Sequence, residues 1–138
     1  MPVEHRTVAV ETRKRGASDI TSEIAAAVHS MGVDDGLAHL FLQHTSASLI
    51  IQENADPSVL SDLEDWLVRH VPDGDPRYRH SQEGPDDMSA HIKTMLTATS
   101  LTVPIEGGRL ALGTWQGIYL FEHRTQSHRR RVVVSVVS

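Results

Sequence analysis

The stretch from Leu37 to Asn54 constrains the fold of this chain most, because it has the pattern of two strands joined by a polar turn. In the first strand, every second side chain is alanine or leucine, so one face of that strand is apolar. His44 falls at the end of the apolar face. Three hydroxyl side chains follow closely, namely Thr45, Ser46 and Ser48. A core needs neither an imidazole nor clustered hydroxyls there, so the turn is a candidate functional site.

The length and composition are those of one ordinary globular domain, which we expect to span residues 1–138. The formal net charge of −5 argues against a general binder of nucleic acid or of anionic membranes. Because the chain has no cysteine, disulfides, thiolate zinc sites and cysteine nucleophiles are excluded. The N-terminus lacks an apolar signal core and no apolar run reaches membrane-spanning length, so we expect a cytoplasmic protein.

The order of strand and helix patterns predicts an α+β fold with mainly antiparallel sheets, a sandwich-like core and two or three helices. The expected strands are Val3–Thr12, the two arms of Leu37–Asn54, Leu101–Ile105, Arg109–Leu112, Ile118–Glu122 and Arg129–Val137. The expected helices end near Ser30, Pro72 and Leu96, and their caps are Ser18 or Asp19, Asp56, and Asp86 or Asp87. Arg13–Ala17 reads as a charged turn and Asp73–Pro85 as a long loop. The third helix has an apolar stripe formed by Met88, Ile92, Met95 and Leu96.

Two further histidines are candidates for a metal site. His80 lies in the long loop, and His91 comes four residues after Asp87 on the third expected helix. At that spacing a carboxylate could orient the imidazole or share a metal with it. With His44, these histidines would suit zinc or another transition metal, with a fourth position for water or a ligand. The alternative is structural: Asp87 only caps its helix, and the histidines only satisfy local hydrogen bonds.

Two carboxylates are candidates for proton transfer. Glu122 ends an apolar strand face, where burial could raise the pKa of its carboxyl and make it an acid or a base. The alternative for Glu122 is a strand end in solvent. Asp56 is first a helix cap and only second a functional carboxylate.

Two more segments could contact a ligand. In Gly113–Gly117, two glycines bracket Thr114, a tryptophan and Gln116, and glycine permits close approach of a ligand or a neighbouring subunit. In Arg129–Arg131, alternation sends the middle arginine to the opposite face of the last strand. These arginines could bind phosphate, or they are a solvated strand end.

Three segments resemble the YjbQ family, also called the secondary thiamine-phosphate synthase family: HTSASLIIQENADP, YRHSQEGPDDMSAHIK and PIEGGRLALGTWQGIYLFEHR. The resemblance extends from about Glu4 to Val137. It implies a compact α+β domain that assembles as a homotrimer and has a weak thiamine-phosphate synthase activity. That reaction joins a pyrimidine methyl diphosphate to a thiazole phosphate and releases pyrophosphate. The sequence has no P-loop and no aspartate-rich diphosphate motif, which fits a weak activity better than a dedicated synthase.

The resemblance also implies site residues and partners. The metal ligands it implies are His44, His80 and His91, for a divalent metal that is zinc first, with magnesium or manganese as alternatives. The residues implied in proton transfer are Glu122 and Asp56. The residues implied in binding a small phosphorylated metabolite are Thr45, Ser46, Ser48, Thr114, Gln116 and Arg131. Neither nucleic acid nor membrane is an expected partner. A non-catalytic protein that binds a phosphorylated metabolite, a metal-dependent hydrolase, and histidines that serve only trimer packing remain alternatives.

Overall fold

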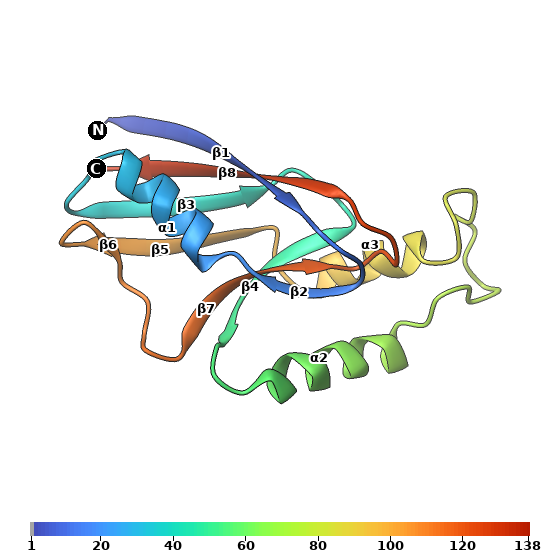
Figure 1. Cartoon of the computed structure of the whole chain (residues 1–138). Helices are drawn as coiled ribbons and strands as arrows, with labels where there is room; N and C mark the ends of the chain where they lie inside the picture. The colour runs from blue at the N-terminus through green and yellow to red at the C-terminus, as the bar shows by residue number, and fades with distance from the viewer. Residues whose placement is uncertain (1) are drawn as a thin grey trace.

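Two antiparallel sheets form the core of the computed structural model, which describes residues 2–138 (Figure 1). The strands of the first sheet, in spatial order, are β1 (Val3–Glu11), β8 (Arg129–Val137), β3 (Gly36–Leu42), β5 (Ser100–Glu106) and β6 (Arg109–Leu110). Those of the second sheet are β2 (Gly16–Asp19), β7 (Gln116–Glu122) and β4 (Ala47–Glu53). The predicted α+β class is confirmed, and β8 is a central strand as its valine-rich sequence indicated.

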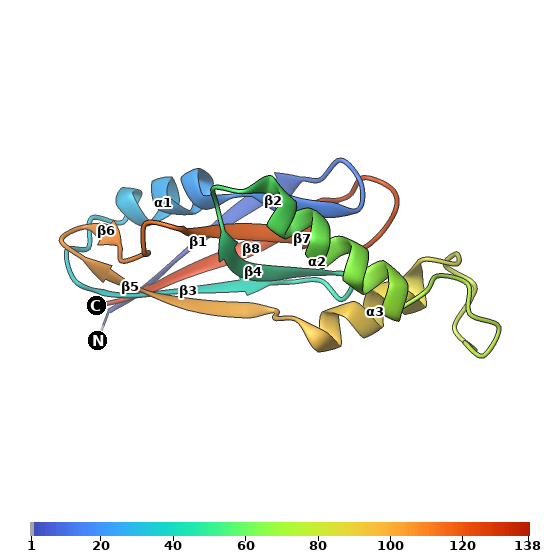
Figure 2. The same cartoon turned by 90° about the horizontal axis from the view of Figure 1, so that it is seen from below.

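Within residues 2–138 the chain also forms three helices: α1 (Thr21–Ser30), α2 (Pro57–His70) and α3 (Asp87–Leu96). α2 packs against β2 and β4, and α3 packs against β4, so both lie on the second sheet. Figure 2 shows α2 and α3 on that side, with α1 set apart from them near β1 and β6. None of the three helices has the length and apolar character that crossing a membrane requires.

The core lies between the inward faces of the two sheets. Ala38, Leu40 and Leu42 of β3 are 0–1% exposed, which confirms the alternation predicted for the first strand. Their partners on β8 are valines that are equally buried. Each fully buried leucine stabilises the fold by about 1.5–3 kcal/mol, so these inward rows hold the strand register firmly.

The turn at residues 43–46 carries the chain from one sheet to the other. β3 belongs to the first sheet, whereas β4 belongs to the second. The prediction of a strand, a polar turn and a strand is therefore confirmed, but the turn is a crossing between sheets and the two arms do not pair. The polar side chains of the turn consequently lie where both sheets end.

Two predictions for residues 13–20 are wrong. Gly16–Asp19 is a strand and not part of a turn, because Gly16 pairs with Glu122 and Asp19 with Tyr119 on β7. Helix α1 begins at Thr21, and its N-cap, Ile20, makes no side-chain capping bond. The Asp19 carboxylate still accepts a hydrogen bond from the Thr21 backbone N–H at 2.9 Å. The acidic side chain therefore supports the start of the helix from one residue before the cap position.

Helix α3 forms where predicted, but its most buried face is not the predicted apolar stripe, of which Met88 and Ile92 are only half-buried. Its buried residues are Asp87, Ser89, Ala90 and Lys93. Met95 and Leu96, from the predicted apolar stripe, are 75% and 55% exposed. The helix thus turns polar groups toward the second sheet and leaves apolar groups at the surface.

Candidate functional site

The inward rows of both sheets end in polar side chains at one end of the core. Leu42 of β3 lies opposite Val132 of β8, and the Gln43 N–H continues this ladder by donating to the Arg131 carbonyl at 3.1 Å. His44 and Arg130 are therefore the next inward-facing pair. We call the following residues the polar end: Thr12, His44, Ser46, Glu122 and Arg130.

The Glu122 carboxylate is the centre of the polar end. It is 0% exposed and receives hydrogen bonds from Thr12 Oγ1 at 2.7 Å and from Arg130 Nε at 2.9 Å, both at Oε1. Oε2 accepts from Arg130 Nη2 and from the Arg124 backbone N–H. Burial alone would raise the pKa of Glu122, but the hydrogen bonds from Arg130 and Thr12 outweigh burial and lower it. The predicted raised pKa is wrong, whereas the role of Glu122 in proton transfer stays a prediction.

Beside the polar end, two histidines meet on one carboxylate. His80 Nε2 lies 2.7 Å from Asp87 Oδ2, and His91 Nε2 lies 3.1 Å from the same oxygen. The three possible ligand atoms lie within 4.8 Å of one another. Asp87 is buried, while the His80 and His91 side chains are 44% and 32% exposed. The cluster therefore has a firm base and one side open to solvent, as a metal site that also binds a ligand requires.

A backbone carbonyl fixes the protonation of His91. Its Nδ1 lies 2.8 Å from the Thr45 carbonyl oxygen, which can only accept, so Nδ1 must carry a proton. In the neutral ring, the lone pair of Nε2 then faces Asp87 Oδ2, and two acceptors at this distance repel each other. A proton or a metal cation between them removes the repulsion. The donor set of two imidazoles and a carboxylate is one that zinc and related metals prefer.

Arg124 holds the carboxylates of this region in place. Its Nη1 donates to Asp87 Oδ1 at 2.9 Å, and its Nε donates to Asp86 Oδ2 at 3.1 Å. Asp86 also accepts from the Thr125 N–H, so it ties the start of α3 to the segment after β7 and makes no capping bond. Although burial raises the pKa of Asp87, the His80 hydrogen bond and the positive charges nearby lower it overall. Asp87 is thus kept in the charged form that a metal ligand needs.

The structure brings together two of the three predicted metal-ligating histidines. His44 lies outside the cluster of His80, Asp87 and His91, and its Nε2 accepts a hydrogen bond from the Arg131 N–H at 3.1 Å. Burial and the charge of Arg130 lower the pKa of His44, which favours the neutral ring. Its place in the metal set therefore has no geometric support.

The predicted ligand-binding residues separate into two groups. Thr45 contributes its carbonyl to His91, Ser46 binds Arg130, and Ser48 bonds to His123 on the helix side of β4. The backbone of Arg131 holds His44. These four lie around the turn and the polar end.

The second group lies at the far end of the second sheet. Ala47 pairs with Glu122 at one end of the β4–β7 ladder, and Glu53 pairs with Gln116 at the other, about 20 Å away. The Gln116 side chain accepts from the Gly113 N–H, and the Thr114 carbonyl accepts from Asn54. Asp56 caps α2 at this end, accepting from the Ser58 N–H at 2.9 Å. These three residues have structural partners and do not reach the His80–Asp87–His91 cluster within one chain.

A third polar cluster was not predicted. Lys93 and His123 are 0% exposed, and both face α2, where Glu64 lies. The buried side-chain atoms without a hydrogen-bond partner within residues 2–138 are Lys93 Nζ, His123 Nδ1 and both carboxylate oxygens of Glu64. One of the two lysines in the chain therefore lies inside the protein. The sequence indicates this cluster only through the polar residues on one face of α3. That face can be recognised as buried only when the position of the helix against the second sheet is known.

Known proteins share both the fold of this chain and its sequence motifs. The model of the family described as "UPF0047 protein YjbQ-like" matches residues 6–138. The chain belongs to the UPF0047 YjbQ-like family. It is 52% identical to UPF0047 protein sll1880 of Synechocystis, over 96% of this chain and 91% of that one. It is 45% identical to UPF0047 protein YjbQ of Escherichia coli O157:H7, over 95% of each chain.

Solved structures show the same fold. A YjbQ/UPF0047 family protein from Clostridium acetobutylicum has a TM-score of 0.87 at 38% identity, over 96% of this chain and 99% of that one. The conserved hypothetical protein TT1486 from Thermus thermophilus has a TM-score of 0.86 at 36% identity, with the same coverage. The family relation predicted from the three motifs is thereby confirmed.

Proposed function

We propose that this protein binds a divalent metal at His80, Asp87 and His91 and acts there on a small phosphorylated molecule. The observation that carries the metal site is the lone pair of His91 Nε2 facing the Asp87 carboxylate at 3.1 Å. Zinc is the metal proposed first, because two imidazoles and one carboxylate are among its preferred ligands. A bound metal would supply Lewis-acid stabilisation of phosphate oxygens.

The specific reaction proposed is the weak thiamine-phosphate synthase activity that the resemblance implies. Support from this chain is chemical: His80 and His91 are open to solvent, and Arg124 lies against Asp87, so a diphosphate leaving group would meet positive charge there. Asp87 would hold the metal in its charged form, and Arg124 would keep that carboxylate oriented. The Thr45 carbonyl would keep the Nε2 lone pair of His91 free for the metal.

Elemental analysis of the purified protein tests the metal site directly. We expect near-stoichiometric metal in the wild type and loss of it in His91→Ala and Asp87→Asn. His39→Ala is the matched control, because His39 bonds only to Thr102 on the outer face of the first sheet. A wild type that takes up no zinc, manganese or cobalt, or variants that keep their metal, would refute the site.

Pyrophosphate release from the two thiamine precursors then tests the reaction. Metal-dependent release that disappears in Asp87→Asn supports the synthase. Stabilisation by a phosphorylated ligand without turnover would instead favour the binding-protein alternative, because a ligand of the native state raises stability without chemistry.

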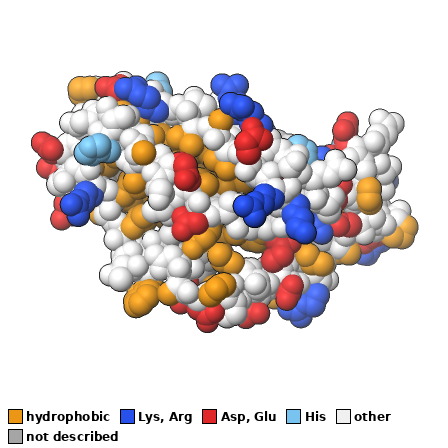
Figure 3. All heavy atoms as spheres, viewed as in Figure 1, with side chains coloured by type: hydrophobic (Ala, Val, Ile, Leu, Met, Phe, Trp, Pro, Cys, Tyr) orange, Lys and Arg blue, Asp and Glu red, His pale blue; other side chains and the backbone are white. Residues whose placement is uncertain are grey.

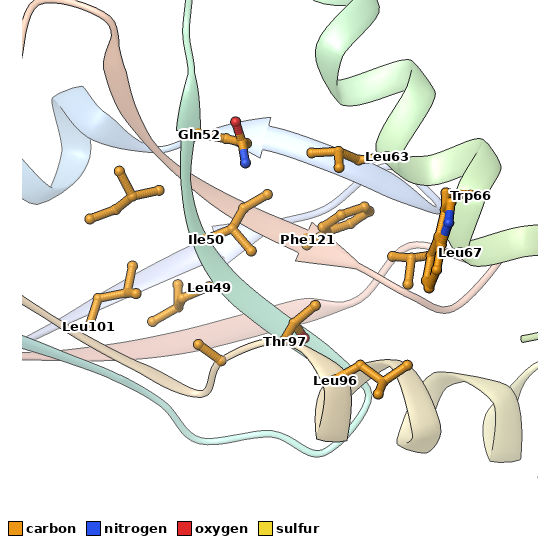
Figure 4. Close-up of a pocket in the computed structure, with 12 residues that line it drawn as sticks. Leu49, Ile50, Gln52, Leu63, Trp66, Leu67, Leu96, Thr97, Leu101 and Phe121 are labelled. Carbon is orange, nitrogen blue, oxygen red and sulfur yellow. The ribbon is translucent and has the colours of Figure 1, made fainter. Parts of the chain in front are cut away.

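We also propose that the protein assembles as a cytoplasmic homotrimer. In support, large apolar side chains on the helices are exposed, and Figure 3 shows hydrophobic side chains between the charged ones on the lower part of this face. An apolar hollow of about 640 Å³ lies between α2 and β4. Figure 4 shows Trp66 and Leu67 of α2 and Ile50 of β4 on opposite sides of this hollow, which Leu96 of α3 also lines. Trp66 is 47% exposed and Leu96 is 55% exposed. Exposed apolar surface of this kind is typical of protein–protein contacts, here with further copies of this chain.

A further inference from the structure

The polar end has more hydrogen-bond donors than the protein itself uses. Both oxygens of Glu122 are already occupied, each by two donors. Arg130 Nε donates to Glu122, and Nη2 donates to Glu122 and to Ser46. Nη1 donates to no acceptor within residues 2–138. Nη1 is not completely sealed from solvent, although Arg130 as a whole is only 4% exposed.

His44 and Ser46 add two further donors beside this guanidinium. Because His44 Nε2 accepts from the Arg131 N–H, the neutral ring carries its proton on Nδ1, which has no partner in the described chain. Ser46 Oγ accepts from Arg130 Nη2 at 2.9 Å, so its own hydrogen is free to donate. His44 follows directly after β3 and faces the same way as Arg130 on neighbouring β8, and Ser46 is bonded to Arg130. The three donor groups therefore lie together at the end of the core.

We propose that Arg130, His44 and Ser46 form an anion-binding subsite for the phosphoryl group of the ligand. The proposal rests on the proposed function only in naming a phosphorylated ligand, since the subsite is built without any metal-ligating residue. Donor groups with no remaining acceptors select an anion, and a guanidinium with two neutral donors matches the several oxygens of a phosphate. Glu122 takes no part in binding the anion and instead fixes the Arg130 side chain.

The charges and the position of these groups agree with an anionic ligand. Burial is the largest cause that lowers the pKa of His44, followed by the charge of Arg130; Glu122 acts in the opposite sense, and Arg131 and His128 lower the pKa further. His44 therefore stays a neutral donor beside Arg130. The metal cluster is adjacent, because Thr45, between His44 and Ser46, accepts the hydrogen bond of His91. A ligand phosphate bound by these three donors would place the rest of the molecule near His91.

Binding of inorganic phosphate and of pyrophosphate to the chelator-treated protein tests the subsite without the metal. We expect saturable binding by calorimetry or by phosphorus NMR, weakened about tenfold or more in His44→Phe and in Ser46→Ala, as the loss of one charge-assisted hydrogen bond would cause. His39→Phe is the control, since it lies on the same strand with its side chain on the outer face. It should bind as the wild type does.

The remaining outcomes separate this proposal from the metal proposal. His44→Phe should keep the wild-type metal content, and loss of metal in that variant would make His44 a ligand and overturn its role as an anion donor. If the wild type bound neither phosphate nor pyrophosphate, or if His44→Phe bound them equally well, Arg130, His44 and Ser46 would have only a structural role at the end of the core. Either result would leave the metal analysis of His91→Ala unaffected.

Discussion

His123 is a histidine that the native state keeps neutral. It is 0% exposed, and its Nε2 lies 2.6 Å from Ser48 Oγ, so the pair is sealed between β7, β4 and the helices. Burial, and then the positive charge of Lys93, lower the pKa of His123 to about 3. A sealed imidazole of this kind cannot exchange protons with solvent near neutral pH, which argues for a role in packing rather than in catalysis.

The pKa of His123 predicts how stability depends on pH. In the unfolded chain this residue takes up a proton below the ordinary histidine pKa of 6.5, whereas in the native state it does so only near pH 3. The free energy of unfolding should therefore fall as the pH is lowered between these values, by at most about 1.4 kcal/mol per pH unit from this residue. In His123→Phe that component should vanish, and stability should decline less steeply between about pH 6.5 and pH 4.

Urea unfolding at several pH values measures the effect. His123→Phe also removes the partner of Ser48, and that loss should lower stability by about the same amount at every pH. The slopes, and not the absolute values, are therefore compared. Parallel curves for the wild type and the variant would contradict the neutral state assigned to His123.

The segment between α2 and α3 is held at both ends by ionic contacts. Asp73, near its start, accepts two hydrogen bonds from Arg15 Nη2 at 3.0 and 2.8 Å and another from Ser89 Oγ. Asp86, near its end, is held by Arg124. His80 lies between these anchors, so its position next to Asp87 depends on contacts made by other residues.

Asp73→Asn should therefore weaken metal binding, although it changes none of the proposed metal-ligating residues. Loss of outer contacts to a ligand-bearing segment reduces metal affinity by about 10- to 100-fold in known sites, and we expect the lower part of this range. Asp75→Asn is the control, because Asp75 lies in the same segment and pairs only with Arg77, which is exposed. Competitive metal titration would measure both variants. Equal affinities would mean that Asp73 does not position His80.

Local sequence patterns predicted most of the helices and strands. They did not predict features that depend on contacts with distant segments, namely strand β2 and the buried face of α3. The alternation in β3 and the Asp56–Pro57 cap of α2 are encoded within a few residues, so their predictions held. β2 was missed because its four residues become a strand only through pairing with distant β7. The buried face of α3 was missed because periodicity locates a helix without saying whether its neighbour is apolar or, as with Glu64 and His123, polar.

The same distinction applies to the candidate site. His91 could be linked to Asp87 from the sequence, since four residues on a helix bring two side chains together. His80 and His44 were added as histidines on other elements and by their positions in the family motifs, and the structure places His80 beside Asp87. Arg124 reaches Asp87 from a segment 37 positions further along the chain, a contact that no local spacing indicates. His44 lies outside this cluster, and the fold gives it a different partner.

At the scale of the whole molecule, large apolar side chains are exposed on the helices as well as on strands and loops. Met95 and Leu96 of α3 are 75% and 55% exposed, and Leu96 lines the hollow beneath α2. In the proposed trimer, neighbouring copies would remove these side chains from water.

Leu96→Glu should disrupt this assembly, because it would place a charge in an apolar contact. Sedimentation velocity should show the wild type as a trimer and the variant as a smaller species with an unchanged circular dichroism spectrum. Leu37→Glu is the control, since Leu37 is 48% exposed on the outer face of β3. A wild type that sediments as a monomer would end the trimer proposal.

The crossing at residues 43–46 also limits how this fold can acquire new specificities. In many folds, a binding loop can be exchanged for a longer one because it joins strands that would pair without it. Here the connection passes between sheets, supplies the Thr45 carbonyl, and holds His44 and Ser46 against β8. An insertion would disturb strand placement and binding together. Divergence of ligand choice within this architecture should therefore be concentrated in residues 71–86, which belong to no strand.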